Sequence, residues 1–306
     1  MQQKSSVKSS PLTIFAKKIN KIDFIFKRTN EMNKTLYVSD LDGTLLNRNS
    51  RLSDESITIL NRLIGECGVN FTIATARTPA TVEGIMKRVN TRLPFIVMNG
   101  AATWDNTTQS FISTTPIDNA TAIQVCNTFE SHGLRPLVYR RKGNRIEVNH
   151  FGPLSEQEKA FVDERRCTNK IFNLNNPYYK TGDNEALLIF AMNDYNRLTP
   201  IYNDVITHIK CSSVCYHDIF DPSAGLMETY AAGVSKAVAV SRLATEIGAE
   251  RLVVFGDNRN DIPMMKIADY AVAPENAVDE VKAIAHEIIE SNDTHSVARY
   301  IAKQQK

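Results

Sequence analysis

From Thr35 onward, the chain alternates short apolar runs with longer amphipathic stretches. The clearest apolar runs lie at 36–40, 71–75, 94–98, 251–255 and 270–273. Their length and apolar character are typical of strands that are buried on both faces. The stretches at 53–67, 79–89 and 235–247 repeat apolar residues at helical spacing. This alternation predicts an α/β fold with a Rossmann-like parallel sheet and helices on both faces.

The middle of the chain, at 117–222, has a different pattern. Its apolar spacing predicts helices at about 118–131, 155–166 and 197–210, and strands at 186–192 and 214–219. Gly143-Asn144 separates two further strand-like runs, at 137–140 and 145–151, and predicts a hairpin. We therefore expect a second, α+β domain at 117–222, inserted into a core formed by 32–116 and 223–306.

The first 31 residues form a basic extension that we expect to be disordered. Residues 1–34 carry a net charge of +6, so the rest of the chain is at −4 although the whole chain is at +2. A basic segment outside the folded body gives no reason to expect a nucleic-acid partner. Lysines interrupt its apolar clusters, so it does not resemble a signal peptide. We expect translation to start at Met32.

Two further features bear on the location of the protein. No apolar run approaches the roughly 18 residues that a membrane-spanning helix needs. The five cysteines form no Cys-x-x-Cys pair, so reduced and buried cysteines are the simplest interpretation. We expect a cytoplasmic protein with no membrane partner.

Several of the predicted strands end in polar residues that could bind a ligand or take part in catalysis. Asp40-Leu-Asp42-Gly-Thr44 follows the first strand, Thr75 ends the second, and Asp257 follows a late one. Ligands of open parallel sheets bind beyond the carboxyl ends of the strands, so these side chains should converge. Lys236, at the start of a predicted helix, and the acidic turn Gly256–Asp261 complete the set.

Each of these signals has an ordinary structural explanation when it is taken alone. Asp-x-Asp-Gly also occurs in turns and in calcium loops, a strand-end Thr is often only a β-branched residue, and a lysine near a helix start is usually solvated. The acidic turn after the late strand also suits a helix N-cap. The ordered set of acid pair, hydroxyl, lysine and second acid pair favours a functional site.

In this ordered set the chain resembles the haloacid dehalogenase superfamily of phosphatases, and within it the Cof-type sugar-phosphatase branch. The resemblance covers nearly everything from Thr35 to the C-terminus, and it implies that 32–116 and 223–306 form the catalytic core and that 117–222 is a cap domain. The four motifs are Asp40–Leu46, Ala74–Arg77, Gly233–Lys236 and Gly256–Asp261, and Asn99–Ala101 and Ser291–Asp293 are also similar to this branch. Ala76 replaces the glycine that the second motif commonly carries.

The resemblance implies a role for each motif residue. Asp40 is the nucleophile that becomes an aspartyl phosphate, and Asp42 is the general acid and base. Mg²⁺ is the implied cofactor, bound by the Asp40 carboxylate, the Asp42 backbone carbonyl and Asp257, with Asp261 supporting its water shell. The implied phosphate ligands are the backbone at Leu41 and Ala76 and the side chains of Thr75, Lys236 and Asn260.

The chemistry of phosphoryl transfer agrees with these roles. A carboxylate repels a phosphate dianion, so the reaction needs positive charge, which Lys236 and Mg²⁺ supply. We expect a phosphomonoester hydrolase acting on a small phosphorylated metabolite, above all a sugar phosphate, and existing as a monomer or weak oligomer. A phosphotransferase or sugar-phosphate mutase with the same Asp40 chemistry is the alternative. A silent sugar-phosphate binding protein is a third hypothesis, and the intact acid and lysine set disfavours it.

Overall fold

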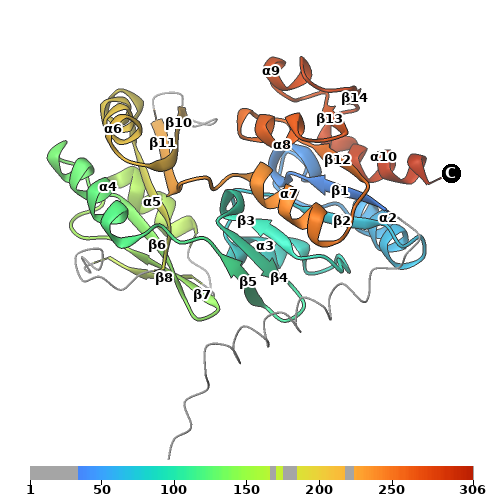
Figure 1. The fold of residues 1–306 in the computed structure, drawn as a ribbon, viewed down its shortest axis with the longest axis horizontal. Coiled ribbons are helices and arrows are strands. Elements are labelled where there is room, and N and C mark those ends of the chain that lie inside the picture. Colours follow the sequence, from blue (N-terminus) through green and yellow to red (C-terminus); the bar gives the residue numbers. More distant parts are fainter. Residues whose placement is uncertain (1–33, 166–169, 175–184, 218–223, 306) are drawn as a thin grey trace, which may run out of the picture.

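The computed structural model describes residues 34–165, 170–174, 185–217 and 224–305 (Figure 1). The predicted basic extension at 1–31 lies outside these described residues. Within the described ranges, the helices lack the combination of length and apolarity that is needed to span a bilayer.

A five-stranded parallel sheet forms the centre of one half of the molecule, in the order β14-β13-β12-β1-β2. All four neighbouring pairs are parallel. The strands are β1 (Thr35–Ser39), β2 (Asn70–Ile73), β12 (Arg251–Phe255), β13 (Tyr270–Pro274) and β14 (Glu287–Ile289).

Helices cover both faces of this sheet, because successive residues of a strand point to opposite sides. On β1, Tyr37 packs into one apolar cluster, whereas Leu36 and Val38 pack into another. The first cluster includes residues of α2 (Asp54–Gly65), α3 (Pro79–Met86) and α10 (Ser296–Gln304). The second includes residues of α7 (Lys236–Glu246), α8 (Ile262–Lys266) and α9 (Asp279–Lys282). The predicted α/β fold is therefore confirmed.

The helices next to the strand ends begin at capping residues that the chain supplies locally. The Ser53 hydroxyl accepts a hydrogen bond from the backbone N–H of Ser56 at 3.0 Å and caps α2. The Ser235 hydroxyl accepts from the N–H of Val238 at 3.2 Å and caps α7. This second cap makes Lys236 the first residue of α7, facing the carboxyl end of the sheet.

A small antiparallel sheet continues from the edge of the parallel one. It consists of β3 (Phe95–Val97), β4 (Ala102–Asp105) and β5 (Ser110–Thr114). A parallel bridge between Ala74 and Ile96 joins β3 to the end of β2. The strands β4 and β5 were not predicted, because their mixed polar and apolar composition lacks a clear alternation.

The middle of the chain forms a separate six-stranded sheet, in the order β10-β11-β9-β6-β7-β8. Its strands are β6 (Leu137–Lys142), β7 (Arg145–Asn149), β8 (Lys170–Asn173), β9 (Ala186–Asp194), β10 (Cys211–His217) and β11 (Ala224–Ala231). The helices α4 (Asn119–Ser131) and α6 (Tyr195–His208) pack into one apolar cluster with the sheet. The helix α5 (Glu156–Glu164) packs on β9, where Phe161 stacks on Phe190.

This sheet differs from the sequence pattern at β11. The hairpin of β6 and β7 is present, but β11 pairs with β9 and β10 and carries the sheet to Ala231. The sheet therefore continues past residue 222, at which the expected middle segment ends. The end of the predicted strand at 214–219 lies outside the described residues, because the structure describes β10 only to His217.

Candidate active site

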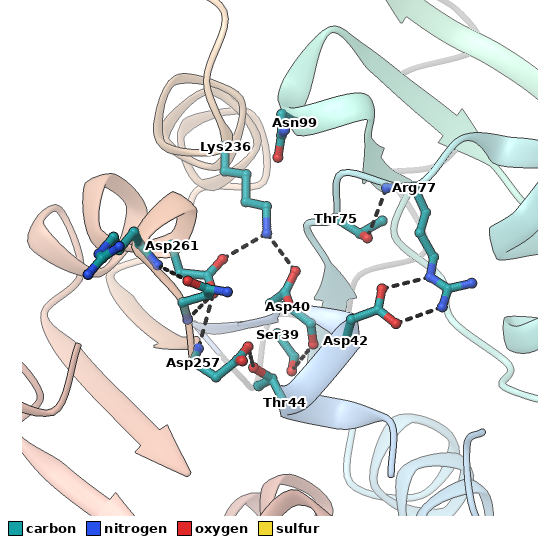
Figure 2. A network of polar contacts seen from close by, with 12 residues as sticks. Ser39, Asp40, Asp42, Thr44, Thr75, Arg77, Asn99, Lys236, Asp257 and Asp261 are labelled. Atoms are coloured by element: carbon teal, nitrogen blue, oxygen red, sulfur yellow. Dashed lines mark hydrogen bonds and ion pairs between the residues drawn. The ribbon is translucent and has the colours of Figure 1, made fainter. Parts of the chain in front are cut away.

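The centre of the candidate site is Asp40, which follows β1 at the carboxyl end of the parallel sheet. Its backbone N–H donates to the carbonyl of Phe255 on β12 at 3.0 Å, which fixes its position between two central strands. Its side chain is buried, and Oδ1 lies 2.5 Å from Nζ of Lys236. The same ammonium group donates to Oδ1 of Asp261 at 2.7 Å (Figure 2). Three segments far apart in the chain thus meet at one buried cation.

The turn after β12 is organised around Asp261, which is fully buried. Its Oδ2 accepts from the backbone N–H groups of Asp257 and Asn258 at 3.0 and 3.1 Å. Asp257 in turn accepts from the hydroxyl of Thr44 at 2.7 Å, so the two acidic motifs are tied together. Gly256 is required here, because an added Cβ would lie 2.5 Å from Cβ of Asp261.

Asp40, Asp257 and Asp261 form a group that could hold a metal ion. Each offers one carboxylate oxygen, and these oxygens lie within 4.8 Å of one another. An octahedral cation with ligands at about 2.1 Å spans roughly 4.2 Å between opposite oxygens, so small side-chain rotations would suffice. An all-oxygen donor set favours a hard divalent cation over zinc or copper.

The charges in this group are unbalanced, because one ammonium group serves three carboxylates. Burial raises the pKa of Asp40 well above its usual range, and repulsion by Asp261 and Asp257 adds to burial against the attraction of Lys236. Burial and repulsion by Asp261 also raise the pKa of Asp257 to about 7. Burial alone would lower the pKa of Lys236, but attraction by Asp261 and Asp40 raises it. A bound cation would relieve the excess negative charge.

The loop after Asp40 requires a glycine at position 43. Gly43 has φ of 76°, and an added Cβ would lie 2.3 Å from Oδ2 of Asp257. The side-chain amide of Asn276 donates to the Gly43 carbonyl at 2.7 Å, and Asn292 donates to the carbonyl of Leu46 at 2.7 Å. Asn292 belongs to the Ser291–Asp293 motif, whereas nothing in the sequence pattern pointed to Asn276.

Asp42 is close to this group along the chain but points away from it. Its two carboxylate oxygens accept from Nη2 and Nε of Arg77 at 2.6 and 2.7 Å (Figure 2). Such a two-pronged pair is the strongest geometry that arginine and a carboxylate adopt. Arg77 is the last residue of the second motif, and the sequence pattern assigned it no function. The structure therefore shows Asp42 in an outward position.

The predicted phosphate-binding residues occupy different positions around Asp40. Thr75 is buried just past the end of β2, next to the end of β1, and its hydroxyl accepts from the N–H of Arg77 at 3.1 Å (Figure 2). Leu41 directly follows Asp40, and Ala76 is half-buried after Thr75. Asn260 is exposed in the turn Arg259–Asp261, between the acidic residues 257 and 261. Of the predicted residues, the structure brings Asp40, Lys236, Asp257 and Asp261 together most tightly.

Comparison with known proteins identifies the family of this chain. The sequence model of the haloacid dehalogenase-like hydrolases matches residues 37–301, and the chain belongs to this family. The four motif segments lie within the matched range. The prediction of an enzyme of the phosphatase class is confirmed by the family and by relatives that are named phosphatases.

Two curated relatives match over most of both chains. One is 5-amino-6-(5-phospho-D-ribitylamino)uracil phosphatase YwtE from Bacillus subtilis, 25% identical over an alignment of 283 residues, with 86% of this chain and 95% of the relative covered. Another is pyridoxal phosphate phosphatase YbhA from Escherichia coli, 28% identical over 272 residues, with 86% and 95% covered. The solved structure of BT4131, a subclass IIB sugar phosphatase of the same superfamily, has a TM-score of 0.67 at 19% identity, covering 88% of this chain and 98% of that one.

Proposed function

We propose that this chain is a Mg²⁺-dependent phosphomonoester hydrolase that acts through an aspartyl phosphate at Asp40. The observation that carries the proposal is the buried contact of Asp40 with Lys236 inside an acidic group at the carboxyl end of the sheet. A carboxylate at this position needs a neighbouring cation before a phosphate dianion can approach it. Lys236 meets that need from within the fold.

The proposed reaction has two steps, and each balances within the site. In the first, an oxygen of Asp40 bonds to phosphorus, the bond from phosphorus to the ester oxygen breaks, and Asp42 donates a proton to the leaving oxygen. In the second, Asp42 takes a proton from a water molecule, whose oxygen displaces Asp40 from phosphorus. Inorganic phosphate leaves, and both aspartates return to their starting states.

The remaining residues position and neutralise the phosphoryl group. We propose that Thr75, Lys236 and Asn260, with the backbone N–H groups at Leu41 and Ala76, bind its oxygens. Mg²⁺, held by Asp40, Asp257 and the backbone carbonyl of Asp42 with Asp261 behind them, would neutralise charge on the transferring group. For Asp42 to serve as the acid, its side chain must leave Arg77 and turn toward the ester oxygen.

The substrate class that we propose is a small phosphorylated metabolite, with sugar phosphates first. We propose that the segment 117–222 and the strand β11 that follows it form a cap over the site. A cap excludes protein substrates and favours compact ligands. The names of the relatives, which act on a ribitylaminouracil phosphate, on pyridoxal phosphate and on sugar phosphates, support small-metabolite substrates.

The test is a screen for phosphate release from the full chain with Mg²⁺. The panel comprises hexose and pentose phosphates, a ribitylaminouracil phosphate, pyridoxal phosphate, nucleotides and a phosphopeptide. We expect release in water alone, with the highest kcat/KM on a sugar phosphate. If phosphate appears only on an added acceptor alcohol or sugar, the alternative of a phosphotransferase or mutase is correct. A lead of more than about tenfold for nucleotides or phosphopeptides, roughly 1.4 kcal/mol of transition-state binding, contradicts the sugar-phosphate proposal.

A further inference from the structure

A buried glutamate on the six-stranded sheet lies beside the candidate active site, and the reaction proposed above does not use it. Glu228 on β11 is only 7% exposed. Its Oε1 accepts from the hydroxyl of Tyr216 at 2.9 Å. Its Oε2 accepts from the hydroxyl of Tyr230 at 2.8 Å and from Nδ2 of Asn99 at 2.9 Å. Asn99 belongs to the other half of the molecule, so this carboxylate joins the two halves.

Asn99 also occupies a backbone conformation that non-glycine residues seldom adopt. Met98 and Asn99 are consecutive and have φ of 52° and 51°. Asparagine tolerates this region better than most residues, but two neighbours in it require support from their surroundings. The side chain of Asn99 receives that support from Glu228 and from the Tyr230 oxygen, 3.1 Å from Nδ2.

The strained turn at 98–99 supports the loop that we propose for phosphate binding. The N–H of Asn99 donates to the carbonyl of Thr75, and the N–H of Met98 donates to the carbonyl of Arg77, both at 3.0 Å. The next residue, Gly100, lies so close to the start of α7 that an added Cβ would sit 2.4 Å from the Ser235 carbonyl. Figure 2 accordingly shows Asn99 on the side of the site where Lys236 and Thr75 lie.

We infer that Glu228 is a positioning residue of the phosphoryl-transfer site: it acts through Asn99 to hold the 98–99 turn, and with it the loop from Thr75 to Arg77. The inference rests on the proposed function, because the loop matters only if phosphate binds there. Burial raises the pKa of Glu228, while Lys236, Asn99 and the tyrosine hydroxyls act in the opposite direction. Because Glu228 lies on β11, the geometry of the loop from Thr75 to Arg77 depends on the position of the six-stranded sheet relative to that loop.

The Glu228 carboxylate accepts all three hydrogen bonds of this cluster. Three donors converge on its two oxygens, and the Tyr230 proton is already donated to Oε2. A glutamine has one acceptor oxygen and two N–H donors, so it cannot accept all three bonds. Either its NH₂ group faces the Asn99 and Tyr230 donors, or it faces the Tyr216 hydroxyl, which must then turn and accept, and in both cases Asn99 loses its charged acceptor. If the Asn99 carboxamide were reversed, its oxygen would face the Glu228 and Tyr230 oxygens. The carboxylate therefore also fixes the orientation of Asn99.

The experiment compares Glu228→Gln and Asn99→Gly with the full-length wild type. Asn99→Gly removes the link to Glu228 but permits a positive φ, so this variant should fold. Glu147→Gln is the matched control, because Glu147 is equally buried in the same sheet (4% exposed) but bonds to Lys142 and Asn149. Three quantities are measured with Mg²⁺ present: the Kd of inorganic phosphate by calorimetry, kcat/KM for p-nitrophenyl phosphate, and Tm.

We expect Glu228→Gln and Asn99→Gly each to weaken phosphate binding and to lower kcat/KM on the order of 10- to 100-fold, as loops displaced by about 1 Å do. The double variant should be no worse than Asn99→Gly alone, because both substitutions break the same link. Glu147→Gln should change Tm without changing phosphate affinity.

Several results would contradict the inference. It is wrong if Glu228→Gln and Asn99→Gly bind phosphate as the wild type does, or if Glu147→Gln weakens binding as much as Glu228→Gln. If the wild type releases phosphate and the two variants match it in phosphate affinity and kcat/KM, this inference alone is overturned. No release from any ester by the wild type overturns the proposed function, and the inference with it.

Discussion

Replacing Lys236 with methionine tests whether one cation balances the acidic group. The side chain is 1% exposed, and its ammonium contacts Asp40 at 2.5 Å and Asp261 at 2.7 Å. Methionine fills a similar volume but removes the charge, and breaking a buried ion pair from one side typically costs about 3–5 kcal/mol. The raised pKa of Lys236 keeps its charge fully present at neutral pH.

The acidic group limits this cost by taking up a proton in place of the lost ammonium. An ordinary aspartate has a pKa of about 3.9, and holding it protonated costs about 1.36 kcal/mol for each pH unit above that value. The loss should therefore be about 4 kcal/mol at pH 7 and about 1.5 kcal/mol at pH 5. We expect Lys236→Met to be less destabilised at the lower pH when a chelator is present.

The assay is urea unfolding of wild type and variant in excess chelator at the two pH values. Lys266→Met is the control, because Lys266 is an exposed lysine at the end of α8, and such surface substitutions usually change stability by less than about 0.5 kcal/mol. Added Mg²⁺ should restore part of the loss at pH 7. A cost that is independent of pH, or no larger than that of Lys266→Met, would refute the charge-balance reasoning.

Three further predictions concern the reaction itself, and a fourth concerns stability. Asp40→Asn should abolish phosphate release while leaving the circular dichroism spectrum unchanged, because an amide is a poor nucleophile; release at the wild-type rate would exclude the covalent mechanism. Asp42→Asn should lower kcat by about 10²–10⁴-fold on an alkyl phosphate and less on an aryl phosphate, whose leaving group needs no proton; equal losses would exclude Asp42 as the acid. Chelator should abolish activity and Mg²⁺ should restore it, whereas turnover by the metal-stripped protein contradicts the metal site. In chelator, the free energy of unfolding should fall as pH rises from about 4 to 7. The reason is that Asp257 has a pKa of about 7 in the folded state, whereas in the unfolded chain it loses its proton at a lower pH. A free energy of unfolding that stays constant over this range would contradict the prediction.

The sequence pattern predicted the main elements because their signals are local. The apolar runs of β1, β2 and β12 are short and bounded, and Ser53 and Ser235 cap the helices α2 and α7. The small strands β4 and β5 carry no such signal, and they are stabilised by pairing with β3. The strand β11 was likewise missed, and its pairing with β9 and β10 defines its place in the sheet.

Chain order and strand direction already define which chemical groups are present and at which end of the sheet they lie. Asp40, Thr75 and Asp257 each follow a strand of one parallel sheet, and parallel strands place their carboxyl ends together. That rule depends only on chain direction, so it holds before any coordinates are known. The family motifs, in their order along the chain, indicate which of these residues belong to one site.

The orientation of these groups and the contacts that support them depend on the three-dimensional packing of the chain. Arg77 holds Asp42 away from Asp40, and Glu228 reaches Asn99 across 129 positions of the chain. Such pairings depend on the packing of two sheets and on which donors remain after the backbone is satisfied. Neither quantity has a local signature, because a buried glutamate and an exposed one are the same letter in the sequence.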